Sequence, residues 1–220
     1  MHKDKNQLFG IIGLGRFGFA LAQGLAESGR EIVVIDSSES KIREAAALTD
    51  NAFTVSELSR DALMECGIQN CDTVIVCIAE QVDVSILTTL NVLELGVKRV
   101  IAKAVSPEQG AVLARLGAEV VYPERDMALR TAKRLTSSRI MEYISLSDTV
   151  DITELVLDEK VEGKTVGELQ LRQRHGLNII AVRKGEQIVT DIRPDMRLCC
   201  GDVVVVCGKT DGIADFEREL

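Results

Sequence analysis

The 220-residue sequence has no tryptophan and only two tyrosines, two histidines and three prolines. Basic residues are also in deficit, because 26 Lys and Arg stand against 34 Asp and Glu, and the formal net charge is −8. Nucleic acids and anionic lipid surfaces attract clustered cations, so this balance argues against both as partners. No apolar run approaches the roughly 20 residues that a membrane-spanning helix needs. With no signal-peptide pattern at the N-terminus, we expect a cytoplasmic protein that binds no nucleic acid.

The six cysteines form no recognisable framework. Cys199 and Cys200 are adjacent, the others are scattered, and no C-x-x-C motif occurs. His2 and His175 are the only histidines, so a metal site built from Cys and His is disfavoured. We expect free thiols in a reducing compartment.

Strand-like and helix-like patterns alternate over residues 1–144. Short apolar runs, such as 31–36 and 72–79, are separated by helical patterns, the last of which covers 124–144. This alternation is typical of a parallel sheet with crossover helices. It predicts a Rossmann-like, doubly wound α/β domain.

The pattern changes over residues 145–220. Here the order is strand, helix, three strands and helix, with one short helix over 163–176 and a hairpin that turns at Gly185. A module with its own apolar strands can form its own core. We therefore predict a second, smaller α+β domain with β-α-β-β-β-α order.

A glycine-rich turn follows the first apolar run. Gly13, Gly15 and Gly18 form the pattern G-x-G-x-x-G between a strand-like and a helical segment. The first glycine permits a tight turn, the second lets a pyrophosphate approach the backbone, and the third lets the helix pack closely on the strand. Asp36 ends the next strand, where a carboxylate can accept hydrogen bonds from ribose hydroxyls and repel a 2′-phosphate. The turn predicts an adenine nucleotide site that disfavours NADP.

The identity of the nucleotide stays open at this point. NAD and ATP both carry adenosine followed by a pyrophosphate, so the turn and Asp36 suit either. Arg16 lies inside the turn, where a guanidinium can pair with further phosphate oxygens. A solvated residue at the start of the helix is an equally good interpretation of Arg16.

A nicotinamide enzyme needs a proton donor or acceptor beside the hydride acceptor. His175 lies in the second module, and neither Tyr122 nor Tyr143 is followed by a lysine four residues later. Lys103, at the end of the fifth strand, is the best remaining acid, yet it could simply neutralise phosphate. The sequence thus favours binding without turnover, and a soluble NAD-dependent oxidoreductase is the alternative.

The sequence resembles the regulatory subunits of bacterial Trk/Ktr-type potassium uptake systems, which are built from RCK (KTN) domains. The N-terminal resemblance lies in "GLGRFG" (13–18), "VID" (34–36) and "PERDMALRTA" (123–132). The C-terminal half resembles the RCK_C (TrkA_C) module through "ELQLRQRHGLNIIAVRKG" (168–185) and "GDVVVVCG" (201–208).

The resemblance implies a non-enzymatic regulator. Such proteins dimerise through the helix after the sixth strand and assemble into octameric rings beneath a membrane potassium-transporting subunit. The chain would thus be peripheral to the inner face of the cell membrane. ATP, ADP or NAD(H) in the N-terminal cleft would change the ring and thereby gate transport.

The resemblance also implies a set of nucleotide-binding residues. Arg16 would reach a terminal phosphate of ATP, and Glu124 would help to hold Mg²⁺ or another cation near the phosphates. Ser56 departs from the family pattern, in which Asp or Asn is common near the adenine. The implied set is Gly13, Gly15, Arg16, Phe17, Gly18, Asp36, Ser37, Ser56, Ala79, Lys103 and Glu124.

Two further expectations concern interfaces. Some RCK_C modules bind cyclic di-AMP at their dimer interface, and the plausible counterparts here are Arg172, His175, Asn178, Ile179 and Pro194. The predicted 124–144 helix could be an ordinary core-facing helix or a dimer surface, and spacing does not decide between them. Its apolar positions are Met127, Leu129, Ala132, Leu135, Ile140 and Met141.

Overall fold

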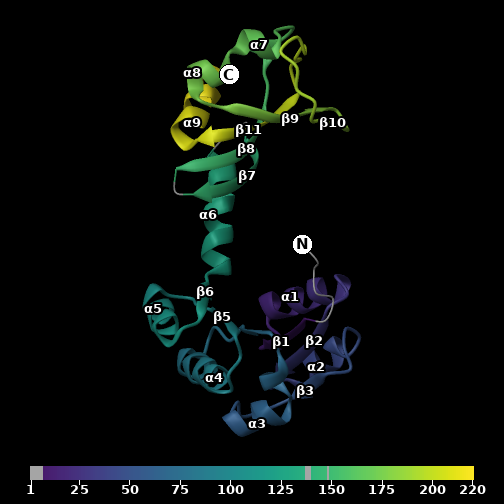
Figure 1. Ribbon diagram of the computed structural model, residues 1–220, viewed down its shortest axis with the longest axis vertical. Coiled ribbons are helices and arrows are strands. Elements are labelled where there is room, and N and C mark those ends of the chain that lie inside the picture. The colour runs from purple at the N-terminus through teal and green to yellow at the C-terminus, as the bar shows by residue number, and fades with distance from the viewer. Residues whose placement is uncertain (1–6, 137–139, 148) are drawn as a thin grey trace. The chain divides into compact units, whose positions relative to one another are not determined.

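Two units make up the chain in the computed structural model, which describes residues 7–136, 140–147 and 149–220 (Figure 1). The first unit ends at Asp126 and the second begins at Met127. The division lies inside helix α6 (Pro123–Thr136). The domain boundary predicted at residues 144/145 falls inside a strand of the second unit, and the limits of the functional domains stay a prediction. Among the described residues, no helix has the length and apolarity needed to cross a membrane.

A six-stranded sheet, parallel throughout, organises the first unit, in the order β3-β2-β1-β4-β5-β6. In β2, all residues after the first are buried, as expected of a parallel strand covered on both faces. The prediction of a Rossmann-like, doubly wound sheet is confirmed. The strands are β1 (Leu8–Ile12), β2 (Glu31–Asp36), β3 (Ala52–Thr54), β4 (Thr73–Val76), β5 (Arg99–Lys103) and β6 (Glu119–Val121).

Helices cover both faces of this sheet. Ala22 and Ala45 bring α1 and α2 into one apolar cluster. Leu63, Val92 and Leu113 bring α3, α4 and α5 into a second cluster, which contains the alternate residues of the same strands. The elements are α1 (Arg16–Glu27), α2 (Glu39–Ala45), α3 (Arg60–Glu65), the 3₁₀ turn η1 (Ile68–Asn70), α4 (Val82–Glu94) and α5 (Pro107–Leu116).

The strand order reverses between β1 and β4. The chain leaves β1 toward the α1 face and leaves β4 toward the α4 face. The two connections diverge, and a crevice opens at the carboxyl ends of these strands. Ligands of doubly wound folds bind at this switch point.

The second unit contains an antiparallel sheet in the order β10-β9-β11-β8-β7, and the helices over 166–175 and 210–219 pack on one face of it. Residues of β8 alternate between buried and half-buried, because only one face is covered. Leu169, Ile213 and Phe216 close the core from the helices. The elements are β7 (Ile140–Ser147), β8 (Val150–Val156), η2 (Glu159–Val161), α7 (Val166–Leu169), α8 (Leu171–His175), β9 (Asn178–Lys184), β10 (Gln187–Val189), β11 (Val203–Lys209) and α9 (Thr210–Glu219).

The structure corrects two helix predictions and confirms a turn. The helix predicted over 124–144 ends at Thr136, and β7 pairs with β8 instead, since β-branched and aromatic residues suit a strand once a partner is present. The single helix predicted over 163–176 is split into α7 and α8 at Gln170, which has a left-handed φ of 48°. The hairpin between β9 and β10 turns at Gly185, as predicted.

Candidate functional site: a cleft at the carboxyl ends of the parallel strands

A cleft of about 1160 Å³ lies in the first unit where the strand order reverses. All residues of the predicted nucleotide set except Gly18 line it. The chain brings them from the first turn, the ends of β2, β4 and β5, the segment after β3, and the start of α6. The lining consists of Ile12, Gly13, Gly15, Arg16, Phe17, Ile35, Asp36, Ser37, Lys41, Val55, Ser56, Glu57, Leu58, Ser59, Arg60, Cys77, Ile78, Ala79, Glu80, Gln81, Val84, Leu87, Thr88, Asn91, Lys103 and Glu124.

The three glycines of the first turn have different surroundings. Gly13 has a φ of 96°, and its N–H donates to the Ile35 carbonyl at 2.7 Å. A Cβ on Gly15 would meet nothing within 4 Å, whereas one on Gly18 would lie 2.0 Å from the Gly13 carbonyl oxygen. Gly15 therefore leaves room for a ligand in the cleft, whereas Gly18 allows the start of α1 to pack directly against the backbone of the turn at Gly13.

Helix α1 begins at Arg16 and has an uncapped N-terminus. No side chain caps its first turn, and no acidic residue lies there. The N–H groups of a first helical turn have no partner within the helix and attract anions. Together with the space beside Gly15, they form a place suited to a pyrophosphate, with the Arg16 side chain at its edge.

Asp36 is buried at the end of β2 and already holds the local backbone. Its Oδ2 accepts from the Leu14 N–H at 2.6 Å, and its Oδ1 accepts from the Ser38 N–H at 2.8 Å. The carboxylate thus links the glycine turn to the segment after β2. The remaining lone pairs of its two oxygens can accept from a ribose.

Lys103 and Glu124 form an ion pair in the cleft. Lys103 Nζ lies 2.5 Å from Glu124 Oε1, and the Lys103 side chain is 9% exposed. The Lys103 ammonium also lies 5.9 Å from the centre of the Phe17 ring. The hydrogen bond from Lys103 lowers the pKa of Glu124 below its ordinary value. Glu124 is therefore a carboxylate at neutral pH, and it pairs with the one buried cation of this lining.

Several residues that line the cleft belong to no sequence motif, so the sequence alone does not identify them as site residues. The segment after β3 contributes Val55, Leu58 and Arg60, and Asn91 of α4 donates to the Leu58 carbonyl at 3.0 Å. These residues meet only through the fold. Lys41 was also missed, although a cation shortly after an acidic strand end is a readable signal.

Two side chains that often act as acids or bases in enzymes are missing from the lining of this cleft, which includes no histidine and no tyrosine. Burial raises the pKa of the Cys77 thiol to about 12, so this thiol is protonated and a poor nucleophile at neutral pH. Among the described residues, no cluster of three or more His, Cys, Asp or Glu side chains is arranged to hold a metal ion. His2 lies outside the described residues, and His175 lies in the second unit.

The residues predicted to bind a second ligand lie on separate elements of the second unit. Arg172 and His175 are on α8, Asn178 and Ile179 begin β9, and the Pro194 carbonyl accepts from an N–H of α7. The His175 side chain is 5% exposed.

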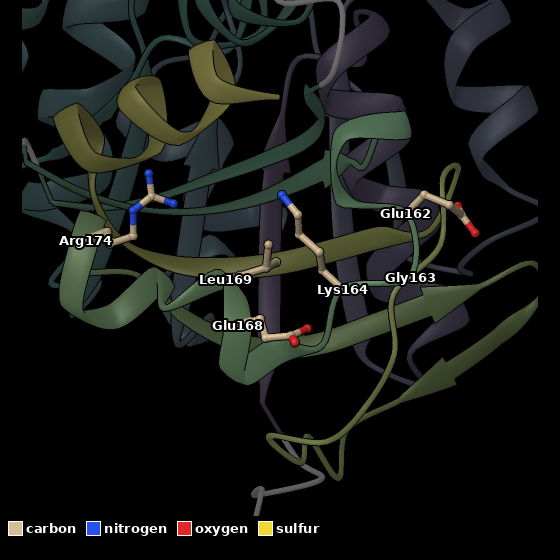
Figure 2. A pocket seen from close by; sticks show the side chains of 6 residues that line it. All are labelled: Glu162, Gly163, Lys164, Glu168, Leu169 and Arg174. Carbon is tan, nitrogen blue, oxygen red and sulfur yellow. The ribbon is translucent and has the colours of Figure 1, made fainter.

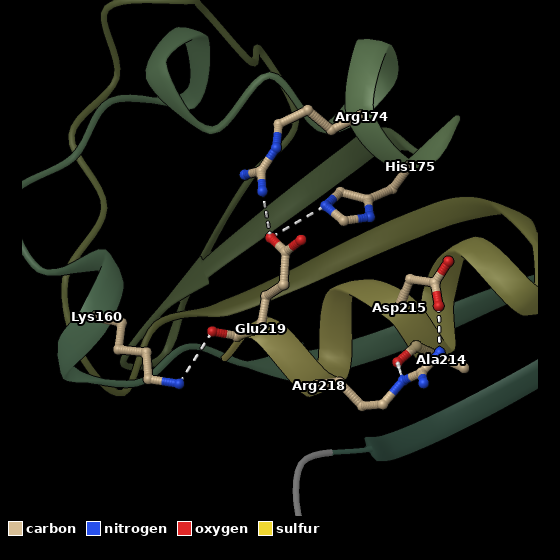
Figure 3. Close-up of polar contacts among 7 residues, drawn as sticks. All are labelled: Lys160, Arg174, His175, Ala214, Asp215, Arg218 and Glu219. Carbon is tan, nitrogen blue, oxygen red and sulfur yellow. Dashed lines mark hydrogen bonds and ion pairs between the residues drawn. The ribbon is translucent and has the colours of Figure 1, made fainter.

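Figure 3 shows His175 directed at Glu219 of α9, with 3.3 Å between Nε2 and Oε2, and Arg174 pairing with the same carboxylate. The His175 ring also packs 5.6 Å from that of Phe216. In one chain, His175 therefore joins α8 to α9.

A separate cavity of about 450 Å³ lies in the second unit and includes none of these predicted residues (Figure 2). Its acidic groups serve the local fold: Glu162 accepts from the Cys200 N–H, and Glu168 forms a capping box with Thr165. Hydrogen bonds from Thr165 lower the pKa of Glu168. The full lining is Glu162, Gly163, Lys164, Glu168, Leu169 and Arg174.

Comparison with known proteins gives matches over both units. The family model of the TrkA-N domain matches residues 9–123, and that of the TrkA-C domain matches residues 152–220. Ktr system potassium uptake protein C of Bacillus subtilis is 34% identical over 213 residues, which are 96% of each chain. Ktr system potassium uptake protein A of Vibrio alginolyticus is 33% identical over 221 residues, 99% of this chain and 100% of that one.

Solved structures share the fold. A GsuK channel bound to NAD superposes with a TM-score of 0.66 at 22% identity, over 99% of this chain and 40% of the channel chain. GsuK bound to ADP gives a TM-score of 0.50 at 26% identity, over 60% of this chain and 34% of that one. The chain thus spans less than half of these channel chains.

Proposed function

The chain belongs to the family of TrkA-N and TrkA-C domain proteins that includes the Ktr system potassium uptake proteins, and on this premise we propose that it is a nucleotide-sensing regulatory subunit of a membrane potassium transporter. It binds ATP, ADP or NAD(H) reversibly and catalyses no reaction. It works at the cytoplasmic face of the membrane, where its transporter partner lies.

The cleft is the observation that carries this proposal. An open backbone position at Gly15, the uncapped start of α1 and the buried Asp36 carboxylate are matched to the pyrophosphate and ribose of an adenine nucleotide. The likeness to GsuK bound to ADP supports the same ligand class. The absence of histidine and tyrosine from this lining, and the high pKa of Cys77, favour binding over turnover.

Calorimetry on the purified chain tests the proposal directly. We expect ATP and ADP to bind, and prolonged incubation of bound NADH with small carbonyl compounds to leave NADH unconsumed. A protein that binds no adenine nucleotide does not fit the proposal. Steady oxidation of NADH would instead favour a soluble oxidoreductase with Lys103 as the acid.

Regulation requires that the ligand distinguish two conformations. A nucleotide shifts the equilibrium only by its difference in affinity for the two states, and a nearly complete shift needs about 5 kcal/mol. The Lys103–Glu124 pair is placed to respond, because Glu124 stands at the start of α6. A polyphosphate competes for Lys103 and leaves Glu124 able to hold Mg²⁺ or another cation beside the phosphates.

Replacing Arg16 with alanine is expected to weaken ATP binding about tenfold more than ADP binding, because a charged hydrogen bond to the terminal phosphate is lost only from ATP. Titration calorimetry of both nucleotides measures this ratio. Arg43→Ala is the matched control, since Arg43 pairs with Glu39 and does not line the cleft. Equal losses for ATP and ADP in Arg16→Ala would remove Arg16 from phosphate sensing.

The exposed side chains of α6 support a homodimer through this helix. Met127 is 58%, Leu129 59% and Leu135 81% exposed in the single chain, and Ala132 is also exposed. In the single chain, these four side chains are exposed to solvent, which favours the dimer surface over the core-facing alternative. The side chains of Ile140 and Met141 lie outside those that the structure describes. Dimers of this kind are then the building blocks of the octameric ring that we propose.

Leu135→Asp is expected to convert the dimer to monomer, because each subunit would place a charge in a desolvated interface. Light scattering during gel filtration measures the mass. Val112→Asp is the control, since Val112 is a half-exposed apolar residue of α5 in the first unit. A Leu135→Asp protein that stays dimeric would place the interface elsewhere.

Cyclic di-AMP is the second ligand that we propose, at the dimer interface of the second unit. The five residues concerned are Arg172, His175, Asn178, Ile179 and Pro194, and their separate positions in one chain are compatible with a site completed by a partner chain. Calorimetric titration of the unaltered dimer with cyclic di-AMP tests this proposal. We expect binding to be lost in Asn178→Ala.

A further inference from the structure

The part of the cleft around Asp36, where the proposed nucleotide places its ribose, holds a cation as well as the Asp36 carboxylate. We call this part the ribose corner. Lys41 of α2 lines the cleft, and its Nζ lies 3.2 Å from Asp36 Oδ2 and 3.5 Å from Oδ1. The Lys41 side chain is 45% exposed, whereas that of Asp36 is 7% exposed. The ammonium therefore stands on the solvent side of a nearly buried carboxylate.

This arrangement changes what the corner offers to a ligand. Each Asp36 oxygen already accepts one backbone N–H, from Leu14 or Ser38, and Lys41 spans both oxygens. A carboxylate alone repels a phosphate on the ribose 2′ position, but a carboxylate paired with an ammonium is neutral overall. A nearby cation is the usual means by which such folds accommodate a 2′-phosphate.

A hydroxyl group adds to the same part of the cleft, because Ser37, which follows Asp36 directly, also lines it. Hydroxyl and ammonium donors are among the groups that hold phosphate monoesters in proteins.

We propose that Lys41, with the hydroxyl of Ser37, forms a subsite for a ribose 2′-phosphate, so that the cleft accepts 2′-phosphorylated adenine nucleotides such as NADP(H) beside unphosphorylated ones. This inference rests on the proposed function, and it reverses the expectation from Asp36 alone that NADP is disfavoured. Lys41 thus sets the ribose specificity of the sensor.

Two ligands that differ only in the 2′-phosphate test the subsite: 5′-AMP and adenosine 2′,5′-bisphosphate, titrated at constant ionic strength. In the unaltered protein, we expect their dissociation constants to agree within about tenfold. In Lys41→Met, the affinity for the bisphosphate should fall about tenfold or more relative to the affinity for 5′-AMP, because one charged hydrogen bond is removed. Lys41→Arg should keep the ratio of the unaltered protein.

The controls separate this inference from the function on which it rests. Arg43→Met removes a cation from the same helix that pairs with Glu39 and does not line the cleft, so it should leave the ratio unchanged. A preference for 5′-AMP above tenfold in the unaltered protein, or a ratio that Lys41→Met changes less than fivefold, overturns the subsite while ADP binding keeps the proposed function intact. Failure to bind ADP, 5′-AMP and the bisphosphate overturns both.

Discussion

Alanine in place of Asp36 is expected to weaken ATP and ADP binding about 100-fold or more. The substitution removes the acceptor for the ribose hydroxyls, and each hydrogen bond to a charged group contributes about 1.5–3 kcal/mol. It also removes the acceptor of the Leu14 N–H, so the glycine turn loses the bond that fixes it beneath the phosphates. Calorimetric titration with each nucleotide measures the loss.

Two further variants separate these effects. Asp36→Asn keeps an oxygen that can accept from the Leu14 N–H but removes the charge, so it should lose less affinity than Asp36→Ala. Asp61→Ala removes an exposed acid from the first turn of α3, outside the cleft lining, and should bind as the unaltered protein does. If Asp36→Ala binds ADP with unchanged affinity, the ribose does not lie at this strand end.

The first unit could be predicted closely because its determinants are local. Each strand is a short apolar run, helix α5 begins after the capping residue Ser106 with Pro107 in its first turn, and Gly117 ends it in a left-handed conformation. Parallel strands joined by helices leave few possible topologies. The glycine turn and Asp36 could then be placed at one edge of the sheet from chain order alone.

Errors arose where tertiary partners decide the structure. The segment after Thr136 has a spacing that suits a helix, yet its antiparallel partner β8 makes a strand of residues 140–147. The break between α7 and α8 lies at Gln170, which is neither glycine nor proline, so the sequence does not predict it. In the cleft, Leu58 and Asn91 come together through a hydrogen bond across the fold, and no spacing rule connects residues so far apart in the chain.

The surroundings of Asp36 could not be predicted from its position in the sequence. Asp36 was identified from its place at a strand end, and its charge alone implied exclusion of a 2′-phosphate. The structure adds an ammonium 3.2 Å away, on a helix whose orientation only the packed fold defines. In our proposal, the ribose specificity of the cleft therefore depends on the pair of Asp36 and Lys41, which a single residue type does not predict.

Gly18→Ala is expected to destabilise the first unit by about 3 kcal/mol, because overpacking against backbone is costly. The new Cβ would lie 2.0 Å from the Gly13 carbonyl oxygen and 3.2 Å from Cys77 Cβ, and neither neighbour is the free end of a flexible side chain. Either α1 moves off the sheet or the turn at Gly13 changes shape, and nucleotide binding weakens in both cases. For a chain of this size the melting temperature should fall by roughly 6–12 °C.

A second glycine of α1 provides the control, because its replacement by alanine should stabilise the protein. Gly24 is an exposed glycine in the interior of α1, and a Cβ there would meet nothing within 4 Å. Gly24→Ala should therefore stabilise the protein by about 0.5–1 kcal/mol, since glycine is a poor helix former, and should leave nucleotide affinity unchanged. Calorimetric unfolding and ADP titration of the two variants, side by side, measure both effects. Equal melting temperatures for Gly18→Ala and Gly24→Ala would mean that α1 does not pack on the glycine turn as closely as these distances require.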